Sequence, residues 1–199
     1  MSDTAATVRP ATTGDREAVV ASVVAAFATD PAWVFITGGE VARVSPHFAR
    51  ALFDVRVGDG TVWVTDDCRA VAMWEDRTTP RVDDPRHAAV WAAYREAVGQ
   101  ESWTWLQRYD DALHPREPAR PYWYLGVLAT HPDAQGTGLA TAVLGPVLAA
   151  ADARGLDCWL ETSAPANTEY YERRGFTERV EVAVEGGPTT WWMHRRPRS

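Results

Sequence analysis

Apolar side chains recur at helical spacing in three parts of the chain, and each part predicts an amphipathic helix. The first helix is expected from about residue 13 to residue 28, before Asp30-Pro31, because the residue that precedes a proline avoids the helical region. The second is expected over 41–56 and the third over 86–111. The first two patterns are carried by Val19, Val20, Val23, Val24 and Phe27, and by Val44, Phe48, Leu52 and Phe53.

Runs of β-branched and aromatic residues predict the strands of one sheet. Residues 122–130 are almost continuously apolar, which is typical of a buried central strand. A loop over 131–138 and a helix over 139–153 lead to a strand at 157–162, which together form a strand–helix–strand unit. The other expected elements are strands at 8–12, 61–65, 70–74, 176–184 and 189–194 and a short helix at 167–174. No linker separates them, so a single mixed-sheet α/β domain is expected over 1–199.

Composition and charge narrow the class of protein. The chain has 199 residues, of which 46 % are hydrophobic and 24 % charged, as is usual for a globular domain. Its net charge of −7 argues against a general nucleic-acid binder and favours a cationic small molecule as partner. No apolar run approaches the roughly 20 residues that span a bilayer, and residues 1–10 lack the apolar core of a signal peptide. A cytoplasmic monomer or homodimer without a membrane partner is therefore expected.

The metal-binding residue types are sparse. Cys68 and Cys158 have no spacing that suggests a disulfide framework or a zinc site. The histidines show no ligand spacing either, and they are expected on the surface or in loops: His47, His87, His114, His131 and His194. The sequence predicts no metal site.

A glycine loop follows the central strand, and it is the first candidate for chemistry. Gln135-Gly136-Thr137-Gly138-Leu139-Ala140 places small residues where a helix begins. Glycines let the backbone approach an anion, and the helix N-terminus supplies N–H groups and positive potential. The loop could equally be a plain turn. It lacks the lysine of a P-loop and the third glycine of a dinucleotide fingerprint.

A second block lies shortly after this loop. Leu160-Glu-Thr-Ser-Ala-Pro-Ala-Asn167 is followed by Thr-Glu-Tyr-Tyr171-Glu-Arg-Arg-Gly-Phe176. Together with Gln135-x-x-Gly138-x-Ala140, this block resembles the GNAT superfamily of acetyl-CoA-dependent N-acetyltransferases. Within it the chain is most similar to the puromycin N-acetyltransferases of actinomycetes, a likeness that includes 8–12, 62–67 and 187–191. The resemblance implies a GNAT fold, with helices on both faces of a mixed sheet and a splayed pair of central strands holding the cofactor.

The resemblance also implies roles for individual residues. Acetyl-CoA would be the acetyl donor, with no metal. The main chain of the central strand would pair with its pantetheine arm at Leu128, Ala129 and Thr130. The loop backbone would hold its pyrophosphate at Gln135, Gly136, Thr137, Gly138, Leu139 and Ala140. Asn167 would contact the pantetheine from the other side, and Tyr171 would give its proton to the departing thiolate.

The resemblance also makes Glu161 the candidate base for the acceptor amine, because relatives place an acid on this strand, and makes Asp30 and Trp33 candidate acceptor-binding residues, because this region lines the acceptor pocket in the superfamily. Each has an ordinary structural alternative. Tyr171 could be a packed tyrosine, Glu161 a structural partner, and Asn167 the cap of its helix. Asp30 could simply end a helix, and Trp33 could belong to the core.

The sequence leaves open which molecule receives the acetyl group, and three hypotheses remain. The first hypothesis is transfer of the acetyl group to a primary amine of a small molecule, such as the aminonucleoside antibiotic puromycin, with a role in antibiotic resistance. The second is acetylation of peptide or protein N-termini, and the third is a non-catalytic acyl-CoA sensor. Thr137 stands where lysine is frequent in the superfamily, and 32–36 and 80–120 differ from the puromycin enzymes. Because those segments shape the acceptor pocket, acetyl-CoA is the firmer expectation.

Overall fold

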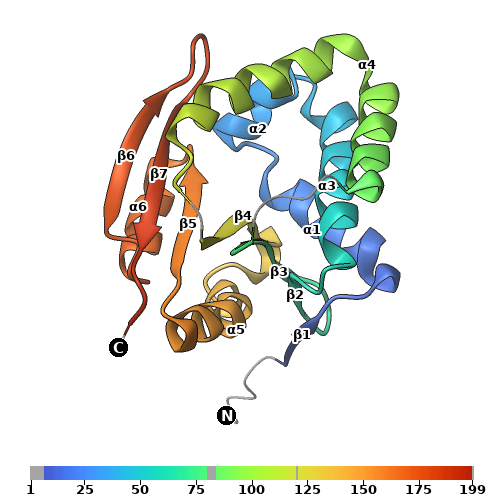
Figure 1. Cartoon of the computed structure of the whole chain (residues 1–199). Coiled ribbons are helices and arrows are strands. Elements are labelled where there is room, and N and C mark those ends of the chain that lie inside the picture. Colours follow the sequence, from blue (N-terminus) through green and yellow to red (C-terminus); the bar gives the residue numbers. More distant parts are fainter. Residues whose placement is uncertain (1–6, 80–83, 120, 199) are drawn as a thin grey trace.

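The strands form one seven-stranded sheet in this computed structural model, which describes residues 7–79, 84–119 and 121–198. The strand order is β1-β2-β3-β4-β5-β7-β6, and neighbouring strands are antiparallel except for the parallel pair β4 and β5 (Figure 1). The strands are β1 (Val8–Pro10), β2 (Val62–Thr65), β3 (Ala70–Arg77), β4 (Tyr122–Thr130), β5 (Asp157–Thr162), β6 (Glu178–Ala183) and β7 (Thr189–Arg195).

Helices cover both faces of this sheet. Helices α1 to α4 share the larger hydrophobic core, whereas α5 and α6 pack on the opposite face around the buried side chains of Trp74, Leu144 and Phe176. The expected α/β fold is confirmed. The helices are α1 (Arg16–Ala26), α2 (Pro31–Ile36), α3 (Val41–Val57), α4 (Pro85–Leu113), α5 (Leu139–Arg154) and α6 (Pro165–Glu172), with 3-10 turns at Thr13–Asp15, His114–Arg116 and Pro132–Ala134.

Strands β4 and β5 are paired only over the first part of β4. Their register runs from Tyr122 opposite Asp157 to Leu125 opposite Leu160, and the described residues show no further pairing between these strands. The later residues of β4, 126–130, therefore have one edge without a strand partner. The expected splayed pair of central strands is confirmed.

A β-bulge in β4 lies at the point where the two strands separate. Met73 of β3 pairs with Val127 and Trp74 pairs with Leu125, so Gly126 is the extra residue. Bulges bend a strand and increase its twist, and they are frequent beside active sites. The bulge thus turns the end of β4 away from β5.

Helix α2 was not expected from the sequence. Asp30 caps its N-terminus by accepting hydrogen bonds from the backbone N–H groups of Ala32 (2.9 Å) and Trp33 (3.1 Å), and Pro31 occupies its first turn. Both residue types favour these positions. The same dipeptide therefore ends one helix and begins the next. The third expected helix is also longer than predicted, and α4 is interrupted at Gly99, whose φ is 83°.

The expectation that every histidine lies in a loop or on the surface was wrong for His194. This residue is on β7 and is 7 % exposed, because the alternation of the strand turns it inward. Its ring stacks on Trp159 with the ring centroids 4.2 Å apart.

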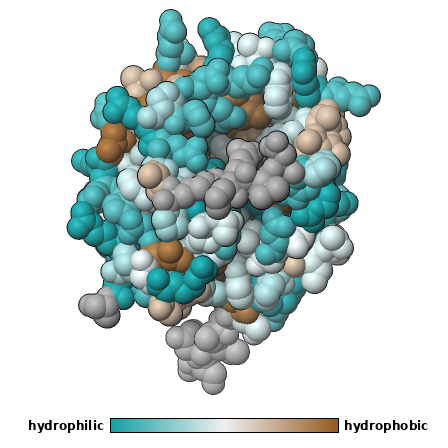
Figure 2. Space-filling view, in the orientation of Figure 1, coloured by the Kyte–Doolittle hydropathy of each residue, from teal (hydrophilic) through white to brown (hydrophobic). Residues whose placement is uncertain are grey.

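The described helices include none that is long and apolar enough to cross a membrane. On the face of the molecule in Figure 2, hydrophobic side chains of the described residues form small separate patches among hydrophilic ones.

Candidate active site

A cleft of about 500 Å³ opens beside the unpaired end of β4, a volume in the range of small-molecule sites. Its walls come from the end of α1, the segment before α2, the end of β4, the loop before α5, the first turn of α5, and α6. It brings together these residues that the sequence singled out: Asp30, Leu128, Thr130, Gln135, Gly136, Gly138, Leu139, Ala140, Asn167 and Tyr171.

The loop before α5 offers backbone donors to this cleft. The N–H groups of residues 136–140 donate to no acceptor in the described chain. Gly136 and Gly138 have φ values of 76° and 85°, which glycine tolerates best, and a Cβ on either would meet nothing within 4 Å. Because the first N–H groups of a helix also carry partial positive charge, the loop fits a pyrophosphate group.

Two of the predicted cofactor residues do not line the cleft. Ala129 is 1 % exposed and packs in the core on the opposite face of the sheet, because side chains alternate along β4. Thr137 is exposed, and its hydroxyl donates to the carbonyl of Ala134 at 2.6 Å. Only the main chain of these two residues is placed to contribute.

Tyr171 on α6 is 8 % exposed and packs edge-on against Tyr170 and Phe176. Burial raises the pKa of its hydroxyl well above the usual value, and the charges of Asp30 and Glu161 raise it further. The phenol therefore stays protonated at neutral pH and is able to donate a proton inside the cleft.

Asn167 is the third residue of α6, whose N-cap is Ala164. The alternative in which Asn167 caps this helix was wrong, because Pro165 starts the helix two residues earlier than expected. The Asn167 side chain is exposed at the wall of the cleft. It is thus free to contact a bound molecule.

Asp30 lies where the cleft meets the larger core. Besides capping α2, its Oδ1 accepts a hydrogen bond from the Ser163 hydroxyl at 3.3 Å, which ties it to the end of β5. Burial raises the pKa of this carboxyl, although the hydrogen bonds from Trp33, Ala32 and Ser163 oppose that change. Both roles considered for Asp30 are compatible, since one carboxylate caps the helix and lines the cleft.

The structure does not place Trp33 in the cleft. Its indole is 5 % exposed and stacks on Phe27 with the ring centroids 4.6 Å apart. Phe27 itself lines the cleft. The packing alternative therefore describes Trp33, because the first turn of α2 directs this side chain into the core.

Glu161 is outside the cleft, on the face of β5 that α4 covers. Tyr124 donates a hydrogen bond to Glu161 Oε2, with 2.5 Å between the oxygens. Burial raises the pKa of Glu161 to about 7, against the lowering effects of the Tyr124 hydrogen bond and the Arg77 charge. A carboxyl that titrates near neutrality is suited to accept a proton at physiological pH.

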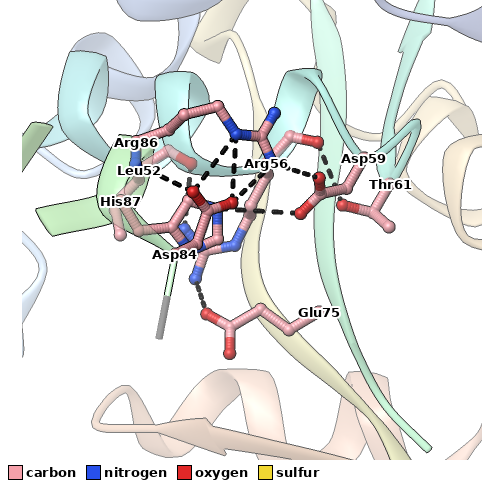
Figure 3. Close-up of polar contacts among 8 residues, drawn as sticks. All are labelled: Leu52, Arg56, Asp59, Thr61, Glu75, Asp84, Arg86 and His87. Atoms are coloured by element: carbon pink, nitrogen blue, oxygen red, sulfur yellow. Dashed lines mark hydrogen bonds and ion pairs between the residues drawn. The ribbon is translucent and has the colours of Figure 1, made fainter. Parts of the chain in front are cut away.

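Further charged groups lie on the same face as Glu161. Arg77 pairs with Glu75 and with Glu117, each at 2.8 Å. Arg56 reaches from α3 to Glu75 and donates to the carbonyl of Leu52 at 2.9 Å (Figure 3). Ion pairs of Arg86 with Asp84 and with Asp59 connect the start of α4 to the turn after α3 (Figure 3).

Asp110 on α4 adds another carboxylate to this side. The side chain is exposed, and its pKa is raised by the protein that crowds it on one side and by the charges of Asp111 and Glu75. Its charge in turn raises the pKa of Glu161. The negative charges on this side favour a cationic molecule.

Sequence reasoning missed Arg174 and Tyr170 as lining residues of the cleft. The Arg174 guanidinium lies 3.3 Å from the centroid of the Tyr170 ring and contacts the hydroxyl of Thr141 in the first turn of α5. Arg174 is the one cation among the described lining residues. Arg174 lies in the block from Tyr171 to Phe176, and this position was the sequence signal that could have identified it as a cleft residue.

The family comparison agrees with this arrangement. The model of the acetyltransferase (GNAT) family matches residues 61–176, more than half of the chain. The chain belongs to the acetyltransferase (GNAT) family. The narrower resemblance to puromycin N-acetyltransferases stays a prediction.

Solved structures of acetyltransferases share the fold at low sequence identity. One is "histone acetyltransferase HPA2 and related acetyltransferase" from Corynebacterium glutamicum, with 23 % identity over 98 % of this chain and 97 % of that chain, and a TM-score of 0.57. The polyamine N-acetyltransferase of Drosophila melanogaster has 14 % identity over 96 % and 99 % and a TM-score of 0.60. The mosquito protein "arylalkylamine N-Acetyltransferase like 5b" has 13 % identity over 96 % of this chain and 100 % of that chain, and a TM-score of 0.62. These identities support the fold alone.

Proposed function

We propose that this acetyltransferase moves the acetyl group of acetyl-CoA directly to a primary amine of a small molecule. The observation that carries the proposal is the placement of a proton donor and a proton acceptor around the split sheet. Tyr171 stands in the cleft, and Glu161 stands on the neighbouring strand close enough for its charge to raise the pKa of Tyr171.

The backbone would hold the donor through main-chain contacts. The unpaired edge of 126–130 would accept an extended pantetheine arm as an additional strand, and the N–H groups of 136–140 would bind the pyrophosphate. Asn167 would contact the pantetheine from α6. When bound, acetyl-CoA would supply a thioester carbonyl that an amine attacks without an enzyme nucleophile.

The side chains would move the protons of the reaction. Glu161 would take a proton from the ammonium group, which frees the nitrogen lone pair to bond to the thioester carbon while the carbon–sulfur electron pair leaves on sulfur as a thiolate. Tyr171 gives its proton to this thiolate and regains one from the acetylated nitrogen. Each proton transfer of this type typically contributes roughly 10²–10⁴-fold in rate.

Helix α4 lies over the side of the sheet that carries Glu161, and this supports a small molecule over a peptide as the acceptor. Helix α4 packs across α2 and α3, and Tyr109 on α4 lies within hydrogen-bond distance, 3.3 Å, of Thr190 on β7. A peptide substrate needs an open groove for its backbone. The carboxylates beneath α4 also suit an amine that arrives as a cation.

The experiment is to incubate the purified chain with acetyl-CoA and a panel of amines and to follow thiol release. The panel includes puromycin, a diamine, an arylalkylamine and an N-terminal peptide. Release with puromycin would support the aminonucleoside and resistance hypothesis. Release with the peptide alone would overturn the small-molecule proposal. Calorimetric binding of acetyl-CoA without release from any amine would favour the sensor hypothesis.

A further inference from the structure

Tyr124 holds one oxygen of the Glu161 carboxylate. The tyrosine is 8 % exposed on β4, and its hydroxyl is 2.5 Å from Glu161 Oε2. Burial, together with the charge of Glu161, raises the pKa of Tyr124 well above the usual value, so its hydroxyl keeps its proton and donates. Within the described chain, Glu161 Oε1 accepts no hydrogen bond. One carboxylate oxygen is fixed and the other is available.

Arg77 lies over the ring of Tyr124. The guanidinium carbon is 4.2 Å from the ring centroid, a distance at which a cation is attracted to the ring face. Arg77 is itself fixed, because it pairs with Glu75 and Glu117 and donates to the Tyr122 hydroxyl at 2.9 Å. The cation therefore keeps the phenol in place, and its charge favours the ionised form of Glu161.

Two carboxylates near Glu161 act against its ionised form: the negative charges of Asp110 on α4 and Glu75 on β3 raise its pKa. The nearby phenols Tyr109 and Tyr171 stay neutral, because burial and the charge of Glu161 raise their pKa. Arg77 is the cation that favours a carboxylate at this position. Loss of this cation would raise the pKa of Glu161 further, so that a smaller share of the carboxyl would be ionised and able to accept a proton at neutral pH.

We propose that Tyr124 and Arg77 are positioning residues for Glu161: Tyr124 holds Oε2 by its hydrogen bond, Arg77 holds the Tyr124 ring, and Oε1 is left to accept the proton of the acceptor amine. The inference rests on the proposed function, since it assigns a task to the base of that reaction. In the step that it serves, an N–H bond of the ammonium breaks, an O–H bond forms at Oε1, and the lone pair remains on nitrogen.

The test measures the protonation of Glu161 itself. Infrared spectra recorded across pH follow the C=O stretch of the protonated carboxyl, and the Glu161 band is assigned by its absence in Glu161→Gln. In Tyr124→Phe the titration should move upward by roughly one to two pH units, because a hydrogen bond to the charged form is lost. Tyr94→Phe is the matched control. The Tyr94 hydroxyl is buried without a hydrogen-bond partner in the described chain, so its removal should leave the titration where it is.

Arg77→Met is the second variant, and it should move the titration in the same direction through loss of the cation. In activity assays, Tyr124→Phe should lower kcat and shift the acidic limb of the pH profile upward while leaving the KM for acetyl-CoA unchanged. The proposal would be overturned if the Glu161 carboxyl of both variants titrated at the same pH as in the wild type, or at a lower pH. If no amine is acetylated by the wild type, the proposed function fails, and the infrared titration still decides whether Tyr124 and Arg77 control Glu161.

Discussion

Replacement of Glu161 by glutamine should remove the base and at the same time stabilise the fold at alkaline pH. In the unfolded chain a glutamate titrates near 4.5, whereas in the folded protein burial raises the pKa of Glu161 to about 7. The folded state therefore binds the proton more tightly. This contribution to stability is fully present below pH 4.5 and is lost as the pH rises through 7.

The magnitude follows from those two values. The difference between 4.5 and about 7 corresponds to about 3 kcal/mol of unfolding free energy lost by the wild type at pH 8. At pH 5 most of the loss has not yet occurred, and it amounts to about 1 kcal/mol. Glutamine stays neutral at every pH and keeps an oxygen to accept the hydrogen bond from Tyr124. The variant should thus exceed the wild type in stability by about 2–3 kcal/mol at pH 8 and by much less at pH 5.

Urea unfolding at pH 5, 6.5 and 8 measures this difference directly. Glu181→Gln is the control, because Glu181 is exposed on β6 and the same change of residue type should leave the pH dependence as in the wild type. The reasoning is refuted if Glu161→Gln is no more stable than the wild type at pH 8, or if its advantage is the same at all three pH values.

Three other substitutions test the cleft. Tyr171→Phe should lower kcat by roughly 10²–10⁴-fold while calorimetry shows unchanged acetyl-CoA affinity; weaker binding with unchanged kcat would contradict the acid role. Arg174→Gln should weaken acetyl-CoA binding severalfold at low salt and less at high salt, whereas Arg173→Gln, whose side chain is 67 % exposed and pairs with Glu169, should bind as the wild type does. Gly138→Ala should cost about 1–2 kcal/mol of unfolding free energy and weaken acetyl-CoA binding, because φ at this position is 85°; an unchanged urea midpoint would argue against strain.

The parts of the site that could be predicted from sequence depend on local patterns. Strands β4 and β5 have the bounds expected from their apolar runs, and the helix after the glycine loop begins at Leu139 as expected. The loop residues that reach the cleft through their backbone also lie next to one another in the sequence. Alternation and turn chemistry act over such short distances, so a single sequence carries that information.

The region around Asp30-Pro31 shows why local sequence patterns did not predict which side chains line the cleft. Asp30-Pro31 correctly ends a helix, yet it also has the N-cap and first-turn residues that begin α2. The resulting turn directs Trp33 into the core and leaves Phe27 at the cleft. The sequence contains both aromatic residues, but only the path of the chain decides which of them is exposed to a ligand.

The surroundings of Glu161 depend on contacts between distant parts of the chain. Tyr124 is 37 residues from Glu161 in the sequence, and Arg77 lies on a strand that precedes a long helix. Alternation indicates that each side chain lies on one face of its strand, but not which strands are neighbours or in what register they pair. The hydrogen bond that fixes Glu161 could therefore not be predicted from the sequence, although Glu161 itself could be proposed.

Gly126 connects the two sides of this site. It is the bulged residue at which β4 leaves β5, so it frees the strand edge that faces the cleft. A Cβ at this position would lie 2.8 Å from Nη2 of Arg56 and 3.3 Å from Cε1 of Tyr124. A larger residue would therefore displace the end of the Arg56 side chain and crowd the Tyr124 ring, and glycine lets both groups lie beside the bulge. The residue at which β4 leaves β5 is therefore also the one that leaves room for the Tyr124 ring, whose hydroxyl is hydrogen-bonded to Glu161.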